Sequence, residues 1–210
     1  MGFLMSGNHY CFLNDDKSVD FNAGMAFIYE TKRPGFRNVE KWGAPIRIRC
    51  EGHPSDEDLG TLNQIIKDFN RIEGFPGMEI ADADANDADE NVLLIFAPKE
   101  ALPEIQQQYH LSEIHKGICQ RFSERGEIKR AIVVIESDLD QDYKNSVLLH
   151  EMFHMVGFYG HVNDDTSILN KSEIPILSLS GTDTLALRML YNPEILIWMK
   201  DDEMAEYYRN

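Results

Sequence analysis

The sequence is poor in cysteine and has no long apolar stretch, and both features limit what the protein can be. Only three cysteines, Cys11, Cys50 and Cys119, occur among 210 residues, so at most one internal disulfide is possible and the redox compartment is left open. No apolar run approaches the roughly 20 residues of a membrane-spanning helix, so we expect no membrane span. Residues 1–10 lack the basic start and apolar centre of a signal peptide, so none is predicted.

Positive charge is also scarce. Lysine and arginine together number 20 against 36 aspartates and glutamates, which gives a formal net charge of -16. Because phosphate binding needs a basic face, this balance argues against a nucleic-acid partner. The length and the 43% hydrophobic content allow one sizeable core. We predict a lead-in or arm over residues 1–40 and a single domain over residues 41–210, and the sequence does not indicate an oligomeric state.

One stretch, HEMFHMVGFYGH over residues 150–161, carries candidate chemistry. Residues four apart lie on one face of a helix, so His150 and His154 can bind one metal ion while Glu151 reaches a water bound to it. The residues around this motif are apolar on nearly all sides, which predicts a buried helix. Burying two imidazoles and a carboxylate without partners is unfavourable, and a zinc ion satisfies the imidazoles and uses the carboxylate.

The third ligand is predicted from the residues that follow. Gly157 is expected to end the helix, because glycine tolerates the positive φ that turns the chain back toward the metal. The turn returns His161 as the third ligand. Asp164 or Asp165 is the alternative, because zinc also accepts carboxylates, and we favour His161 because histidine is a preferred zinc ligand.

This stretch resembles the motif of the metzincin clan of zinc peptidases, H-E-x-x-H-x-x-G-x-x-H. The resemblance implies a metzincin-like zincin domain that binds Zn²⁺ through His150, His154 and His161, with Glu151 as the general base. The match is displaced by one residue, since the third histidine of the clan falls at Gly160 here.

The clan also has a tight turn with a methionine beneath the metal, and residues 167–170 occupy the corresponding place. Leu169 stands where the clan has methionine. Leucine and methionine are similar in volume and both apolar, so the exchange need not disturb an ion that this side chain does not ligate. Met189 is a second candidate for the residue beneath the metal. Its alternative role is a core position on the last helix.

Residues 182–192 have the apolar spacing of a helix, with Ser180 and Asp183 as its N-terminal capping pair. This tail resembles that of an uncharacterised bacterial family of metzincin-like proteins that are often exported. The resemblance implies an extracellular or cell-envelope location. Tyr191 has two candidate roles, stabilising an oxyanion at the metal or packing the helix on the core, and we favour packing.

The rest of the pattern predicts an α/β (α+β) fold with a small mixed sheet. Residues 45–50 alternate like a half-buried strand, so we interpret Cys50 as a strand residue and not as a thiol that blocks zinc. A long helix is predicted over residues 57–73, beginning with the capping pair Ser55 and Asp58. Residues 1–40 read as irregular or strand-like.

Two further strands are predicted, over residues 91–97 and 131–136. The resemblance to metzincins implies that a strand beside the cleft aligns the substrate by main-chain pairing. Residues 91–97 are the candidate for this strand, and the alternative is that they form an ordinary core strand. Residues 82–90 carry alternating carboxylates, but they lack the glycine and glutamate of an EF-hand loop, which favours a solvated acidic loop over a calcium site. The remaining histidines, His9, His53, His110 and His115, have no ligand-like spacing.

Together these patterns predict a secreted zinc metalloendopeptidase acting on peptide or protein substrates. A zinc-activated water would attack the carbonyl, with Glu151 as its base. Two alternatives stay open: a catalytically inactive, peptidase-like binding protein, and a zinc hydrolase of non-peptide amides.

Overall fold

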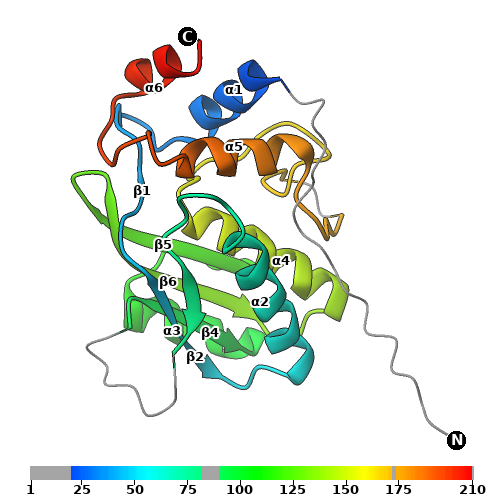
Figure 1. The fold of residues 1–210 in the computed structure, drawn as a ribbon. Helices are drawn as coiled ribbons and strands as arrows, with labels where there is room; N and C mark the ends of the chain where they lie inside the picture. The colour runs from blue at the N-terminus through cyan, green and yellow to red at the C-terminus, as the bar shows by residue number, and fades with distance from the viewer. Residues whose placement is uncertain (1–19, 82–89, 172–173, 210) are drawn as a thin grey trace, which may run out of the picture.

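The computed structural model describes residues 20–81, 90–171 and 174–209, and these form a mixed α/β fold (Figure 1). Within these residues the six strands of the sheet are β1 (Lys41–Trp42), β2 (Ile46–Gly52), β3 (Met78–Ile80), β4 (Val92–Ala97), β5 (Gly117–Glu124) and β6 (Glu127–Glu136). The α-helices of the described residues are α1 (Phe21–Thr31), α2 (Asp56–Phe69), α3 (Leu102–Tyr109), α4 (Gln141–Met155), α5 (Gly181–Tyr191) and α6 (Asp201–Tyr207). A short 3₁₀ helix, Lys99–Ala101, precedes α3.

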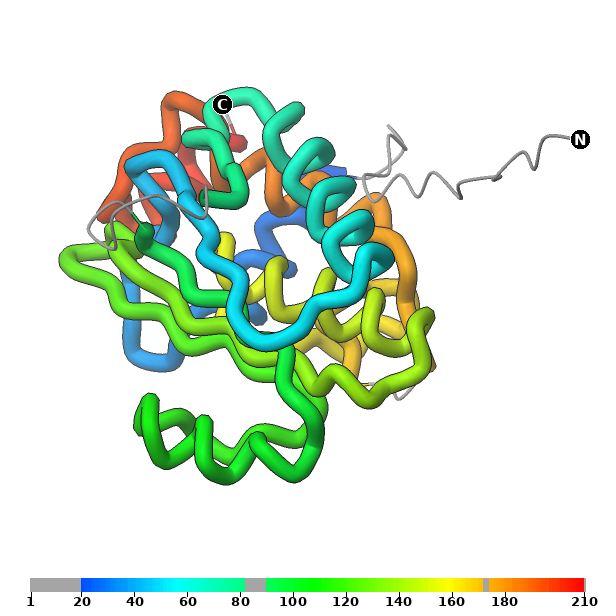
Figure 2. Tube along the Cα trace, turned by 90° about the horizontal axis from the view of Figure 1, so that it is seen from below, coloured from blue at the N-terminus to red at the C-terminus, as the bar shows by residue number. Residues whose placement is uncertain are grey.

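The sheet is mostly parallel and is ordered β1-β6-β4-β2-β3, with β5 also paired to β6. Only β5 is antiparallel to its neighbour among the described strands. The larger core lies between one face of the sheet and α2 and α4, and it continues to α1 and α5. A smaller core lies on the opposite face of the sheet, where Figure 2 shows α3 on the side away from α2 and α4. The sheet is therefore covered on both faces, as parallel sheets generally are.

Several predicted elements are confirmed because their signals are local. The strand expected over residues 45–50 is β2, and the helix expected over residues 57–73 is α2. The side chain of Ser55 accepts from the backbone N–H of Asp58, and the Asp58 carboxylate accepts from that of Ser55. Helix α2 ends earlier than predicted because the Asn70 side chain forms two hydrogen bonds with the main chain of Met78.

The predicted role of residues 91–97 as a substrate-pairing strand is wrong. Strand β4 pairs with β2 on one side and with β6 on the other, so its main-chain groups are used by the sheet. It is an ordinary core strand. The strand next to α4 is β5, which was not predicted, and within the described residues it pairs with β6 alone.

The prediction of an irregular or strand-like segment over residues 1–40 is wrong for residues 21–31, which form helix α1, while residues 1–19 lie outside the described part of the chain. Asp20 caps this helix by accepting from the backbone N–H of Asn22. The helix packs against α5, where a side chain at Gly24 would lie 2.5 Å from the Met189 sulfur. Among the described residues, no helix has both the length and the apolarity to cross a lipid bilayer.

Candidate metal centre

Helix α4 carries the first two histidines of the cluster. His150 and His154 lie one turn apart on it, with ring centroids 4.6 Å from each other. The helix is buried on most sides, since Leu149, Met152 and Phe153 have no exposed surface. Its first turn is fixed by the buried ion pair between Lys144 and Asp58 of α2, with nitrogen and oxygen 3.1 Å apart.

Gly157 follows the end of α4 and turns the chain, as predicted, with a φ of +137°. A side chain here would also collide with the main chain, because a Cβ atom would lie 2.6 Å from the carbonyl oxygen of Glu40. The turn leads to His161, whose ring stacks on that of His150 at a centroid distance of 5.1 Å. The glycine thus brings the third histidine back to the first two.

The Nε2 atoms of the three histidines form a small triangle. Its sides are 3.0 Å between His154 and His150, 3.2 Å between His150 and His161, and 3.4 Å between His154 and His161. Zinc binds imidazole nitrogen at about 2.0–2.1 Å, so nitrogens at two corners of a tetrahedron around it lie about 3.3–3.4 Å apart. The cluster therefore fits a metal ion, and three protein nitrogens leave the fourth corner for water or substrate.

The hydrogen bonds behind the rings fix which nitrogens face the cluster. Nδ1 of His150 lies 2.6 Å from the carbonyl oxygen of Ile168, and Nδ1 of His154 lies 2.8 Å from that of Phe158. A carbonyl only accepts, so both Nδ1 atoms carry the proton and both Nε2 atoms of the neutral rings present lone pairs. Two lone pairs cannot hydrogen-bond to each other, and a cation placed between them is attracted to both.

Burial keeps these imidazoles neutral. It lowers the pKa of His150 to about 4 and the pKa of His154 well below its ordinary value. His161 lies at the surface, but partial desolvation of its ring still lowers its pKa, and the nearby Lys171 adds to that effect. Neutral imidazole is the form that binds metal, so no proton has to leave these rings near neutral pH.

Glu151 lies on the same helix, with its side chain against strand β5. A Cβ atom at Gly117 would lie 3.0 Å from both Cγ and Oε1 of Glu151 and 2.6 Å from Cγ1 of Val147. Only glycine lets the strand pass this close to the carboxyl group. Burial raises the pKa of Glu151 to about 8, and a divalent cation beside it would favour the ionised carboxylate.

The turn over residues 167–170 lies behind His150 and is held by a buried aspartate. The Ile168 carbonyl accepts from His150, while Leu169 is fully buried in the larger core. Asp183 of α5 accepts from the Ser167 hydroxyl at 2.6 Å and from the backbone N–H of Ile168 at 3.0 Å. It has no exposed surface, and its burial raises the pKa of its carboxyl group while these hydrogen bonds oppose the rise. Asp183 thereby orients the first histidine through the turn.

Replacing Asp183 with asparagine is expected to lower the free energy of unfolding by about 2 kcal/mol, because an amide cannot accept all of these hydrogen bonds. Zinc affinity should fall roughly 10- to 100-fold, as for other residues that orient metal ligands. Urea unfolding and competition with a chromophoric chelator measure the two effects. Ser180→Ala is the control: it removes the helix cap at about 1 kcal/mol but leaves Asp183 on the turn. Unchanged zinc affinity in Asp183→Asn would contradict this role.

Three consecutive carbonyls at the end of α4 each accept a hydrogen bond from a different element. The guanidinium of Arg121 on β5 donates to His154, and the indole of Trp42 on β1 donates to Met155 at 2.9 Å. The Tyr191 hydroxyl on α5 donates to Val156 at 2.8 Å. Carbonyls at a helix C-terminus lack the usual partner four residues on; that of His154 also accepts from the backbone N–H of Gly157 at 3.2 Å, and the three side-chain donors add further hydrogen bonds where the helix ends.

Other candidate residues lie outside the cluster. Asp164 accepts from the backbone N–H and hydroxyl of Thr166, and Asp165 accepts from Asn170 at 3.3 Å. Tyr191 is fully buried, which confirms its packing role, and Met189 is a core residue of α5. Cys50 and Cys119 are free thiols within strands. His53, His110 and His115 do not belong to the three-histidine cluster. Cys11, His9 and residues 82–89 of the acidic loop lie outside the described residues.

The fold and this cluster define a class: a mixed α/β protein whose three histidines, two of them on an HExxH-like helix, can hold a metal ion. The chain belongs to the family described as "Protein of unknown function (DUF2927)", whose pattern matches residues 19–210. No curated protein matches the chain.

Proposed function

We propose that the protein is a divergent, metzincin-like zinc metallopeptidase. The observation that carries this proposal is the triangle of three Nε2 atoms, 3.0–3.4 Å apart, on and just beyond the helix that also bears Glu151. His150, His154 and His161 would hold the zinc ion. A site that served structure alone would tend to close the fourth position with Cys or His and would have no use for the acid.

Zinc, when bound, would supply a Lewis acid and lower the pKa of a water molecule to about 7. The protein's own part is to hold and move the proton. Glu151 would accept it from the attacking water and then deliver it to the leaving amine. Its burial against Gly117 keeps bulk water away, and a dry surrounding strengthens electrostatic interactions within the site.

Strand β5 is the proposed support for the substrate backbone, in place of β4. It is paired only to β6 among the described residues, and its first residue, Gly117, lies against Glu151. An extended peptide that added to this edge would be fixed by main-chain hydrogen bonds, which place a scissile bond without demanding particular side chains. We also propose, from the family resemblance of its tail, that the protein is exported from the cell.

The rival is a peptidase-like protein that binds zinc or peptide without turnover. The one-residue displacement of His161 and the leucine at position 169 favour this rival, because both depart from the clan pattern. The presence of Glu151 in the motif favours the peptidase over this rival. Hydrolysis of a non-peptide amide is a further alternative that uses the same groups.

Zinc content and chelation test the proposal. We expect one zinc ion per chain by metal analysis and cleavage of a mixed peptide library by mass spectrometry. A chelator should abolish cleavage, and a stoichiometric addition of zinc should restore it. Stoichiometric zinc with no cleavage of any library peptide would leave the binding protein as the better account, and an absence of bound zinc would refute the enzyme and leave a metal-free binding protein.

A further inference from the structure

We infer that helix α1 is a positioning element of the metal centre, because it holds the loop that presents His161. The inference rests on the metal site of the proposed function. It concerns the segment between His154 and His161, which is one residue longer than in the metzincin pattern. Three kinds of contact join this segment to α1, and each involves a residue that the HExxH motif does not include.

The first contact is made by main-chain groups. The backbone N–H groups of Tyr159 and Gly160 both donate to the carbonyl oxygen of Thr31, each at 2.7 Å. Thr31 is the last residue of α1, so its carbonyl has no acceptor role within the helix. The end of α1 thereby accepts hydrogen bonds from the backbone amides of the two residues that directly precede His161.

The second contact is steric. A Cβ atom at Gly160 would lie 3.0 Å from the carbonyl oxygen of Glu30 and 3.2 Å from Cα of Thr31. Both are main-chain atoms, which cannot swing aside as the end of a side chain can. Gly160, the residue that stands where the clan has its third histidine, therefore allows the longer loop to lie directly on α1.

The third contact is a cluster of aromatic rings. Phe27 of α1 packs edge-on against Phe158 and Phe153, with centroids 5.6 and 6.3 Å away, and the last two rings stack at 4.5 Å. All three residues are buried. The carbonyl of Phe158 accepts from His154, so α1 also supports the residue that orients the second histidine.

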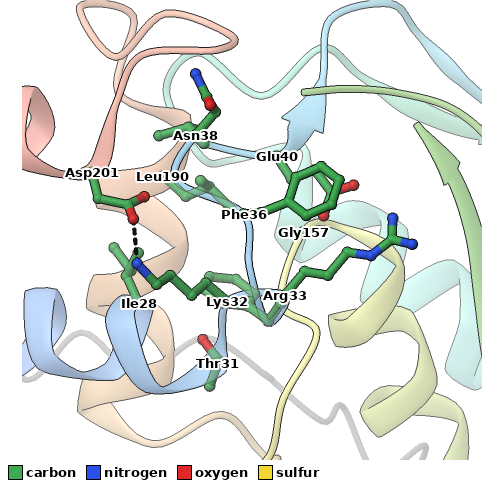
Figure 3. Close-up of a pocket in the computed structure, with 12 residues that line it drawn as sticks. Ile28, Thr31, Lys32, Arg33, Phe36, Asn38, Glu40, Gly157, Leu190 and Asp201 are labelled. Atoms are coloured by element: carbon green, nitrogen blue, oxygen red, sulfur yellow. Dashed lines mark hydrogen bonds and ion pairs between the residues drawn. The ribbon is translucent and has the colours of Figure 1, made fainter. Parts of the chain in front are cut away.

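Helix α1 is itself held by elements away from the loop. It packs on α5, Lys32 forms an ion pair with Asp201, and the hydroxyl of Tyr29 donates to the Asp201 carbonyl at 2.9 Å. Figure 3 shows the Lys32–Asp201 pair beside the recess that Thr31 and Gly157 line. Because these contacts do not involve the loop, the position of α1 is fixed independently of it.

Gly160→Ala is the direct test. We expect zinc affinity, measured by competition with a chromophoric chelator, to fall roughly 10- to 100-fold, the usual effect of disturbing a support of a metal ligand. Gly43→Ala is the control for crowding away from the loop, because its Cβ would meet the end of the Ile197 side chain at 2.4 Å. The control should keep the affinity of the unmodified protein.

A double-mutant cycle separates positioning from general damage. If Gly160 acts through His161, adding Gly160→Ala to His161→Ala should cause no further loss of affinity. An equal loss in both backgrounds, or no loss in either, would overturn the inference.

A second pair of variants covers the case in which Gly160→Ala fails to fold. Phe27→Leu should weaken zinc binding, whereas Phe69→Leu should not, although Phe69 is also buried and has an edge-on contact with Phe75. Equal zinc affinity in these two variants would also count against the inference.

If the unmodified protein binds no zinc, the proposed function fails. If it binds zinc and all the α1 variants match it, only this inference fails.

Discussion

Replacing Glu151 with glutamine is expected to reduce peptide cleavage by about 10³-fold, the typical contribution of a positioned general base. Glutamine has nearly the same shape as glutamate, so it fits against Gly117 and does not disturb the three histidines. Zinc should therefore remain bound at one ion per chain. Cleavage rates on a peptide found in the library screen, together with metal analysis of the same sample, measure both quantities.

Glu136→Gln is the matched control, because Glu136 is another buried glutamate, at the end of β6 and outside the three-histidine cluster. It should cleave at nearly the rate of the unmodified protein. If Glu151→Gln retains full activity with zinc bound, Glu151 is not the base. If both variants lose activity alike, the loss reflects the fold and not the chemistry.

Replacing His161 with alanine is expected to weaken zinc binding by about 100-fold. Structural zinc sites with four ligands bind with roughly 10–16 kcal/mol, so each ligand contributes about 3 kcal/mol, which corresponds to about two powers of ten. The side chain of His161 is exposed, so its loss should leave the free energy of unfolding of the metal-free protein almost unchanged. Chelator competition and urea unfolding without metal measure the two.

Asp164→Ala and Asp165→Ala decide between the candidate third ligands. Both carboxylates hydrogen-bond within their own loop, so neither change should alter zinc affinity by more than a few-fold. A greater loss in either aspartate variant than in His161→Ala would reassign the third ligand. The intensity of the visible absorption of the cobalt-substituted protein gives a second readout, because it reports the coordination geometry.

The parts of the fold that the sequence predicts well are those with local causes. The two capping boxes mark the starts of α2 and α5, and each lies within four residues. The spacing of His150 and His154 follows from one helical turn. The conformation of Gly157 follows from its lack of a Cβ atom. None of these features depends on a distant part of the chain.

The parts that were missed depend on distant partners. Strand β5 has no clear alternation of burial, and it is defined by pairing with β6. Helix α1 gains its stability from packing on α5, more than 150 residues further along the chain. Residues 167–170 were expected to form a turn, but the carboxylate that holds it belongs to Asp183 on the next helix. Periodicity within one segment cannot reveal such contacts.

The donors at the end of α4 also set an order of events during synthesis. His150, His154 and His161 leave the ribosome before Tyr191, whose hydroxyl satisfies the Val156 carbonyl. Trp42 is synthesised more than 100 residues before Met155, whose carbonyl accepts a hydrogen bond from its indole. A nascent chain that ends before residue 181 thus has all three histidines but neither Asp183 nor the last of these donors. We therefore expect the three histidines to bind a metal ion in the geometry described here only after the C-terminal helices have docked.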